Sequence, residues 1–178
     1  MQGSIVVRKL TPEDAELVLA ARLEQVELEA TAFAESPAEV RARTPAVVAE
    51  RLAAPQEEAF VLGAFADGRL AGTAGYFRRP EAKTRHKGRI WGVFVAPAFR
   101  GHGLGRALLR ALVDEARTID GLEQLDLSVA VTQRAARRLY ESLGFSIYGR
   151  ELRSLKVGDG YVDEDLMALH LHGDSTSI

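Results

Sequence analysis

The chain has 178 residues, of which 47% are hydrophobic and 27% charged, a profile typical of one globular domain. It contains no cysteine, which excludes a disulfide framework, a thiolate metal site and a cysteine nucleophile, and we expect no metal site of another kind. The net charge of −2 and the isoelectric point of about 6.1 exclude the broad basic surface of a nucleic-acid-binding protein.

The start of the chain and its apolar runs bear on where the protein works. Residues 1–9 lack the charged region and the apolar core of a secretory signal. No apolar run reaches the roughly 18 residues that a membrane-spanning helix needs. We therefore expect a cytoplasmic protein that has neither a membrane nor a nucleic acid as partner.

The first third of the chain is predicted to form one strand followed by helices. Thr11-Pro12-Glu13-Asp14 combines a capping threonine, a proline at the first helical position and acids in the first turn. Ser36-Pro37-Ala38-Glu39 is a capping box, and Thr44-Pro45 repeats the signal. The expected elements are a strand at 4–9, a helix from 11 to about 29, a loop at 30–35 and two short helices within 37–53.

Apolar runs of strand type begin at Ala59 and alternate later with helical patterns. Asp67-Gly68 separates two such runs, a strong signal for a hairpin. The expected elements are strands at 59–66 and 70–77, a loop at 80–87, a strand at 89–95, a helix at 103–118, a strand at 125–131, a helix at 133–143 and a hairpin of strands at 145–157 and 161–171.

This order predicts the fold class α/β (α+β mixed sheet). Strand, helix, strand in the second half requires a parallel crossover, whereas the consecutive hairpins require antiparallel pairs. We expect a central mixed, mostly antiparallel sheet flanked by helices, in a single domain over 1–178. Residues 1–58 supply its N-terminal strand and helices, 59–172 its core and 173–178 a disordered tail.

The most informative stretch is a glycine-rich loop between the strand at 89–95 and the helix after it. Gly101, Gly103 and Gly105 alternate with other residues, and Arg100 and Arg106 add positive charge. Glycines let successive backbone N–H groups face one concavity, and a helix N-terminus stabilises an anion. The loop is neither a Walker loop nor a dinucleotide fingerprint. It predicts a phosphate site; the alternative is a turn that only packs the helix against the strand.

Two motifs carry a resemblance to a known family. Arg100-Gly101-His102-Gly103-Leu104-Gly105 resembles the Arg/Gln-x-x-Gly-x-Gly/Ala signature of the GNAT superfamily of N-acetyltransferases, and Val95-Ala96-Pro97 resembles the strand ending before it. Leu139-Tyr140-Glu141-Ser142-Leu143-Gly144-Phe145 resembles the second signature, Leu-Tyr-x-x-x-Gly-Phe. The resemblance covers roughly residues 59–171 and implies a GNAT-like acyl-CoA N-acyltransferase fold.

The resemblance implies acetyl-CoA (coenzyme A) as cofactor and names the residues that bind it. The pantetheine arm is expected to pair with the strand before the loop, and the pyrophosphate with backbone N–H groups of the loop. Gln133 stands where many members carry an asparagine that contacts the cofactor. The expected cofactor-binding residues are Val93, Phe94, Val95, Arg100, Gly101, His102, Gly103, Leu104, Gly105, Arg106 and Gln133.

Tyr140 is the expected catalytic residue. The matching tyrosine of the family protonates the leaving thiolate, a role that suits a phenol; by spacing alone, Tyr140 equally fits a helix face in the core. Gly92 lies inside a strand and predicts a bulge that opens a slot for the cofactor and aims a backbone N–H near Phe94 at the thioester oxygen. Room for Trp91 is the alternative reason for this glycine.

The general base is absent from the places where the family carries it. Some members have a glutamate where this chain has Ser128. An ordered water, Glu27, Glu29 or His86 remain as candidates, because a protonated amine cannot attack a thioester. The N-terminal helices, with Glu24, and the loop at 80–87 are expected to form the acceptor pocket.

The sequence thus predicts an N-acetyltransferase that moves an acetyl group from acetyl-CoA to a primary amine by direct attack in a ternary complex. The acceptor is a small-molecule amine or an amine of a peptide or protein. The missing base leaves a non-catalytic acyl-CoA-binding or sensing module as the alternative, and a structural protein that kept only the fold as a third. Edge strands of the C-terminal hairpin allow a homodimer.

Overall fold

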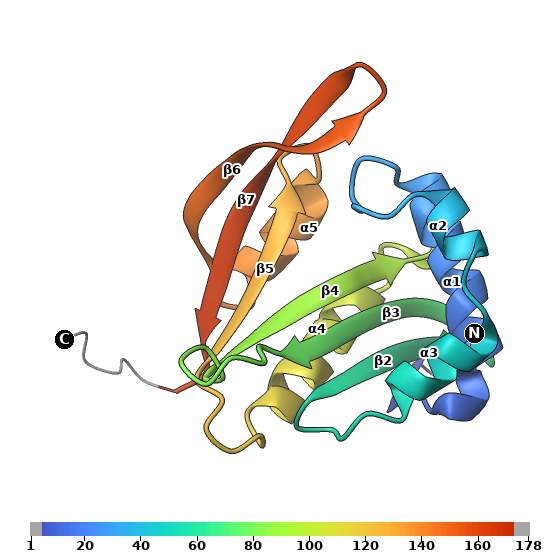
Figure 1. The fold of residues 1–178 in the computed structure, drawn as a ribbon, viewed down its shortest axis with the longest axis horizontal. Coiled ribbons are helices and arrows are strands. Elements are labelled where there is room, and N and C mark those ends of the chain that lie inside the picture. Colours follow the sequence, from blue (N-terminus) through green and yellow to red (C-terminus); the bar gives the residue numbers. More distant parts are fainter. Residues whose placement is uncertain (1–4, 173–178) are drawn as a thin grey trace.

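A computed structural model describes residues 5–172, and its sheet confirms the expected fold class (Figure 1). Seven strands form one sheet in the order β1-β2-β3-β4-β5-β7-β6. Neighbouring strands run antiparallel except for β4 and β5, which are parallel. The strands are β1 (Ile5–Lys9), β2 (Ala59–Ala66), β3 (Arg69–Arg78), β4 (Lys87–Val95), β5 (Gln124–Ala130), β6 (Ser146–Val157) and β7 (Gly160–His170).

Helices cover both faces of this sheet. The apolar face of α4 packs on the face of β2 and β3 that carries Leu62 and Ala74. The first helix lies on the opposite face, where Gln25 donates a hydrogen bond to Thr73. The helices are α1 (Ala15–Leu28), α2 (Pro37–Arg41), α3 (Pro45–Leu52), α4 (Leu104–Ala116) and α5 (Arg134–Glu141), with short 3-10 turns at Pro12–Asp14 and Pro97–Phe99.

Local signals placed most element boundaries within a residue or two. Asp67 and Gly68 both have positive φ, 51° and 77°, as a two-residue hairpin turn requires. The predicted capping box at Ser36 is present, with the Ser36 N–H bonded to the Glu39 carboxylate at 2.8 Å. The predicted first turn of the long helix is instead a 3-10 turn, stabilised by the Thr11 N–H, which donates to Asp14 at 2.9 Å.

The parallel strands β4 and β5 pair over a short segment and then separate. The strands pair from Lys87 opposite Gln124 to Arg89 opposite Asp126, and both then continue without pairing to each other. On the other side of β4, the register with β3 shifts between Thr73 and Gly75, and Gly92 has a φ of 60°. This confirms the predicted bulge at Gly92, which bends β4 away from β5.

Three further expectations concern the ends of the chain and membranes. The predicted first strand begins at Ser4, outside the described residues. The predicted disordered tail at 173–178 also lies outside them. Among the described helices, none has the length and apolar character to cross a membrane.

Candidate active site

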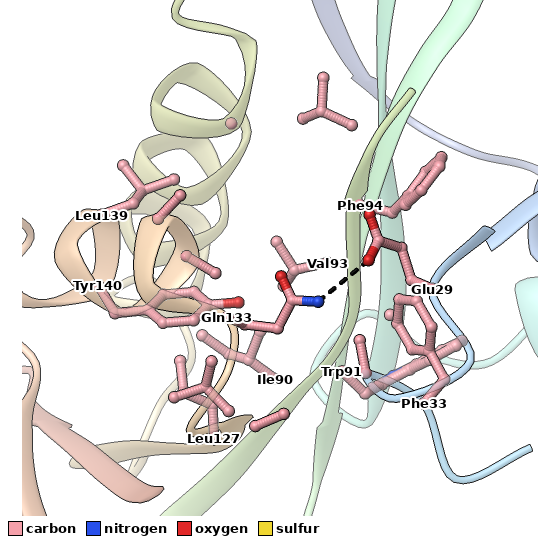
Figure 2. A pocket seen from close by; sticks show the side chains of 18 of the residues that line it. Glu29, Phe33, Ile90, Trp91, Val93, Phe94, Leu127, Gln133, Leu139 and Tyr140 are labelled. Carbon is pink, nitrogen blue, oxygen red and sulfur yellow. Dashed lines mark hydrogen bonds between the residues drawn. The ribbon is translucent and has the colours of Figure 1, made fainter. Parts of the chain in front are cut away.

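A cavity of about 680 Å³ lies where β4 and β5 separate, and Figure 2 shows its side chains. One wall comes from the glycine-rich loop and from α5, including Gly103, Gln133 and Tyr140. The other comes from α1 and the segment after it, including Arg22 and Phe33. The sheet supplies the floor between them, with residues of β4, β5, β6 and β7.

The glycine-rich loop has the geometry of an anion cradle. Gly101 and Gly103 have φ of 79° and 82°, and a Cβ on either would meet no atom within 4 Å. Because the first bond of α4 runs from the Ala107 N–H to the Gly103 carbonyl, 3.0 Å, the preceding N–H groups have no helical acceptor. Open space, exposed N–H donors and a helix N-terminus together fit a pyrophosphate.

Close packing behind the loop fixes its position. A Cβ on Gly105 would lie 3.1 Å from Cδ2 of Leu139 on α5 and 3.6 Å from Cγ2 of Val95 on β4. The start of α4 is therefore wedged between α5 and the end of β4. A small residue at Gly105 therefore suits this close packing, although that position is helical.

The structure brings the predicted site residues together, with one exception. The side chain of His102 is exposed and lies outside the cavity lining. The predicted residues that line the cavity are Val93, Phe94, Val95, Arg100, Gly101, Gly103, Leu104, Gly105, Arg106, Gln133 and Tyr140. Among residues 5–172, no group of three or more His, Cys, Asp or Glu side chains is arranged to hold a metal ion.

A carboxylate from the end of α1 bridges the two walls (Figure 2). Glu29 accepts a hydrogen bond from Nε2 of Gln133 at 3.0 Å and pairs with Arg100 at 2.8 Å. The Nε of Arg100 also donates to the carbonyl of Val95 at 2.8 Å. Two of the predicted cofactor contacts, Arg100 and Gln133, are thus held by Glu29.

Tyr140 projects from α5 toward β4, with its hydroxyl in the cavity (Figure 2). Its ring is 5% exposed and lies edge-on to Phe145, with ring centroids 6.0 Å apart. Burial raises the pKa of Tyr140 above its usual value of 10.0. The hydroxyl therefore keeps its proton at neutral pH and can donate it.

A buried polar chain anchors the Gly92 bulge. Arg22 donates to Gln25 at 2.9 Å, Gln25 to the Thr73 hydroxyl at 2.6 Å, and that hydroxyl to the Gly92 carbonyl at 3.1 Å. Burial lowers the pKa of Arg22 to about 10, so it stays charged at neutral pH, and Glu35 pairs with it at 2.7 Å. These three hydrogen bonds link α1, in the wall of the cavity, to the backbone of β4.

A second polar cluster lies on the same face of the sheet as Thr73. It spans the split, which is the place where β4 and β5 separate. Arg89 on β4 donates to the hydroxyl of Ser128 on β5 at 2.9 Å. Ser128 donates to Glu164 on β7 at 3.2 Å, and Ser154 on β6 donates to the same carboxylate at 2.6 Å. Sequence reasoning missed Arg89 and Glu164, which both line the cavity. Glu164 reaches it because Glu164 is opposite Ala130 in the β5–β7 register.

Other predicted acceptor-side residues lie away from the cavity. Glu24 and Glu27 are exposed, and Glu27 pairs with Arg41. The carbonyl of His86 accepts a hydrogen bond from the N–H of Glu123, next to the segment where β4 and β5 are paired. The loop at 80–87 also contributes nothing to the described lining, whereas Glu29 does.

Comparison with known proteins gives the same family as the motifs. The profile of the Acetyltransferase (GNAT) family matches residues 22–145. The chain is 39% identical over 80 residues to the [ribosomal protein bS18]-alanine N-acetyltransferase of Salmonella typhimurium, covering 45% of this chain and 53% of that protein. It is 32% identical to the spermine/spermidine N(1)-acetyltransferase of Bacillus subtilis, covering 49% and 60%. The chain thus spans about half the length of these relatives.

Solved structures match over nearly the whole chain. The ribosomal-protein-alanine N-acetyltransferase of Brucella melitensis has a TM-score of 0.78 and 26% identity, covering 93% of this chain and 99% of that chain. The structure of yncA from Salmonella typhimurium with its cofactor acetyl-CoA has a TM-score of 0.81 and 24% identity, covering 98% of each chain. The second likeness concerns the fold alone.

Proposed function

Because the chain belongs to the acetyltransferase (GNAT) family of acetyl-CoA-dependent N-acetyltransferases, we propose that it transfers an acetyl group from acetyl-CoA directly to a primary amine in a ternary complex. The observation that carries this proposal is the cavity, which joins the anion cradle of Gly101 and Gly103 to the hydroxyl of Tyr140. A donor bound through its pyrophosphate at one end can present its thioester at the other.

The donor is proposed to lie along the unpaired part of β4. The edge from Val93 to Val95 has no β5 partner, so its backbone can pair with the amides of a pantetheine arm. The pyrophosphate would accept hydrogen bonds from the N–H groups that precede Ala107. Arg100 adds charge there once it parts from Glu29.

Tyr140 is proposed to protonate the leaving sulfur. Its raised pKa keeps the hydroxyl protonated, and its hydroxyl faces the cavity. The bulge at Gly92, held by Thr73, is proposed to direct a backbone N–H near Phe94 at the thioester oxygen. Alignment of amine and thioester supplies much of the remaining acceleration.

The acceptor is proposed to enter between Phe33, Trp91 and the cluster of Arg89, Ser128 and Glu164, all in the cavity lining. Spermidine and a peptide with an N-terminal alanine are the first acceptors to test, because relatives carry names for such amines. A folded protein that binds acetyl-CoA but acetylates no amine would instead support the acyl-CoA-binding module.

The test is turnover with Tyr140→Phe. Since the chain has no cysteine, a thiol reagent reports only the coenzyme A that is released. We expect Tyr140→Phe to lower kcat by about 100-fold or more while the affinity for acetyl-CoA is unchanged. Tyr148→Phe, at a tyrosine that is 57% exposed, is the matched control and should change neither. Unchanged kcat in Tyr140→Phe would refute the assigned role.

A further inference from the structure

The reaction needs a group that takes a proton from the acceptor, because an ammonium cannot attack a thioester. Among residues 5–172, the carboxylates that line the cavity are Glu29 and Glu164. Glu29 pairs with Arg100 and accepts from Gln133, at the end of the cavity that belongs to the phosphate loop. Glu164 bonds instead to Ser128 on β5 and Ser154 on β6.

The sheet places Glu164 and Tyr140 on opposite faces. Ser128 is opposite Leu166 and Ala130 is opposite Glu164, so these four side chains share one face. Tyr140 belongs instead to the hydrophobic core that includes Leu125 and Leu127, whose side chains point to the other face. Both faces open into the same cavity at the split, so an acid and a base can reach one thioester from two sides.

The surroundings of Glu164 suit a proton acceptor. Ser128 and Ser154 donate to its two oxygens, one each, and a carboxylate oxygen has two lone pairs, so both keep room to accept. Arg89 donates to Ser128, which orients the Ser128 proton toward Glu164. Two charged side chains of residues 5–172 face it: the positive Arg89 on β4, which bonds to Ser128, and the negative Glu151, opposite Glu164 on β6.

From this geometry, and resting on the proposed function, we infer that Glu164 is the general base for the acceptor amine, reaching it directly or through one water. Its carboxylate lies against Ser128, the position at which the sequence resemblance expects a base. The carboxylate reaches that place from the neighbouring strand β7 instead of from β5.

The proton and bond balance is complete with the groups present. Glu164 takes one proton from the ammonium and releases it to solvent. The amine nitrogen then bonds to the carbonyl carbon, the carbon–sulfur bond breaks, and Tyr140 gives its proton to the sulfur. The second proton that the nitrogen loses restores Tyr140. The products are the N-acetyl amine, coenzyme A and one proton.

The experiment compares wild type, Glu164→Gln and Glu164→Asp by release of coenzyme A from pH 5 to 10, with spermidine, an alanyl peptide and water as acceptors. The glutamine amide can accept from one serine through its oxygen and donate to the hydroxyl of the other through its NH2, so the fold and the affinity for acetyl-CoA should persist. We expect Glu164→Gln to lower kcat by about 100-fold and to lose the acidic limb of the pH profile of kcat/KM. Glu164→Asp should keep that limb at a lower kcat.

Two controls separate this role from a structural one. Glu151→Gln removes the exposed carboxylate opposite Glu164 and should leave the limb in place. Ser128→Ala should lower kcat by less than Glu164→Gln, since Ser128 only positions the base. A Glu164→Gln protein with wild-type kcat and pH profile overturns the inference alone. A wild type that binds acetyl-CoA but shows no turnover with any acceptor, water included, overturns the proposed function as well.

Discussion

Gly103→Ala separates the cost of backbone strain from the loss of a phosphate contact. Gly103 has a φ of 82° and no atom within 4 Å of a Cβ, and it lines the cavity. Gly68 in the β2–β3 turn has a φ of 77° and equally open space, away from the cavity. Alanine in this left-handed region costs roughly 1–2 kcal/mol at either site. Both variants should therefore lose about the same free energy of unfolding in urea.

Their affinities for acetyl-CoA should differ. A methyl group at Gly103 would extend into the cradle and displace at least one charge-assisted hydrogen bond to a phosphate, worth about 1.5–3 kcal/mol. That corresponds to a dissociation constant about 10- to 100-fold higher by calorimetric titration. Gly68→Ala should bind as wild type does. Equal affinities in the two variants would refute the assignment of this loop to the pyrophosphate.

Three further predictions follow from single contacts. Glu29→Gln removes a carboxylate that competes with phosphate for Arg100. Acetyl-CoA should therefore bind a few-fold more tightly in calorimetry at low salt. Weaker binding would contradict this role of Glu29. Tyr76→Phe should raise the thermal midpoint, because the Tyr76 hydroxyl is buried with no partner among the described residues; a lower midpoint would contradict this. Asp14→Asn removes the pair with Arg8, which lowers the pKa of Asp14 to about 2. The variant should lose about 1 kcal/mol of the free energy of unfolding, a small value because half-exposed Arg8 is screened by solvent. This loss should be full above pH 4 and vanish as the pH falls toward 2, as followed by urea denaturation at each pH.

The parts of the fold that the sequence predicted are those set by a few neighbouring residues. Asp67-Gly68 forms its turn because both residues accept positive φ, and Ser36 with Glu39 closes a capping box within one turn. Gly92 also carries a local signal, since a glycine inside a strand indicates a bulge. Each pattern depends on backbone chemistry close in the chain and was confirmed.

The parts that the sequence could not predict depend on register between distant strands. Glu164 enters the cavity because it lies opposite Ala130, and no pattern around Glu164 gives that pairing. The bridge from Glu29 to Gln133 joins residues 104 positions apart in the chain. Glu29 and Gln133 were candidates from the sequence, but their contact was not, and Glu164 becomes a candidate only once the pairing of β5 with β7 is known.

The single parallel pair explains why the cradle, the acid and the proposed base meet in one place. A parallel connection requires a crossover, and here α4 returns the chain from the end of β4 to the start of β5. The N-terminus of α4 must therefore lie beside the end of β4, where that strand has already left β5. The same departure exposes Tyr140 from one face and Glu164 from the other. Closing the split, for example by a bulge-deleting change at Gly92, would remove all three functions together, whereas changes at Gly103, Tyr140 or Glu164 should separate them.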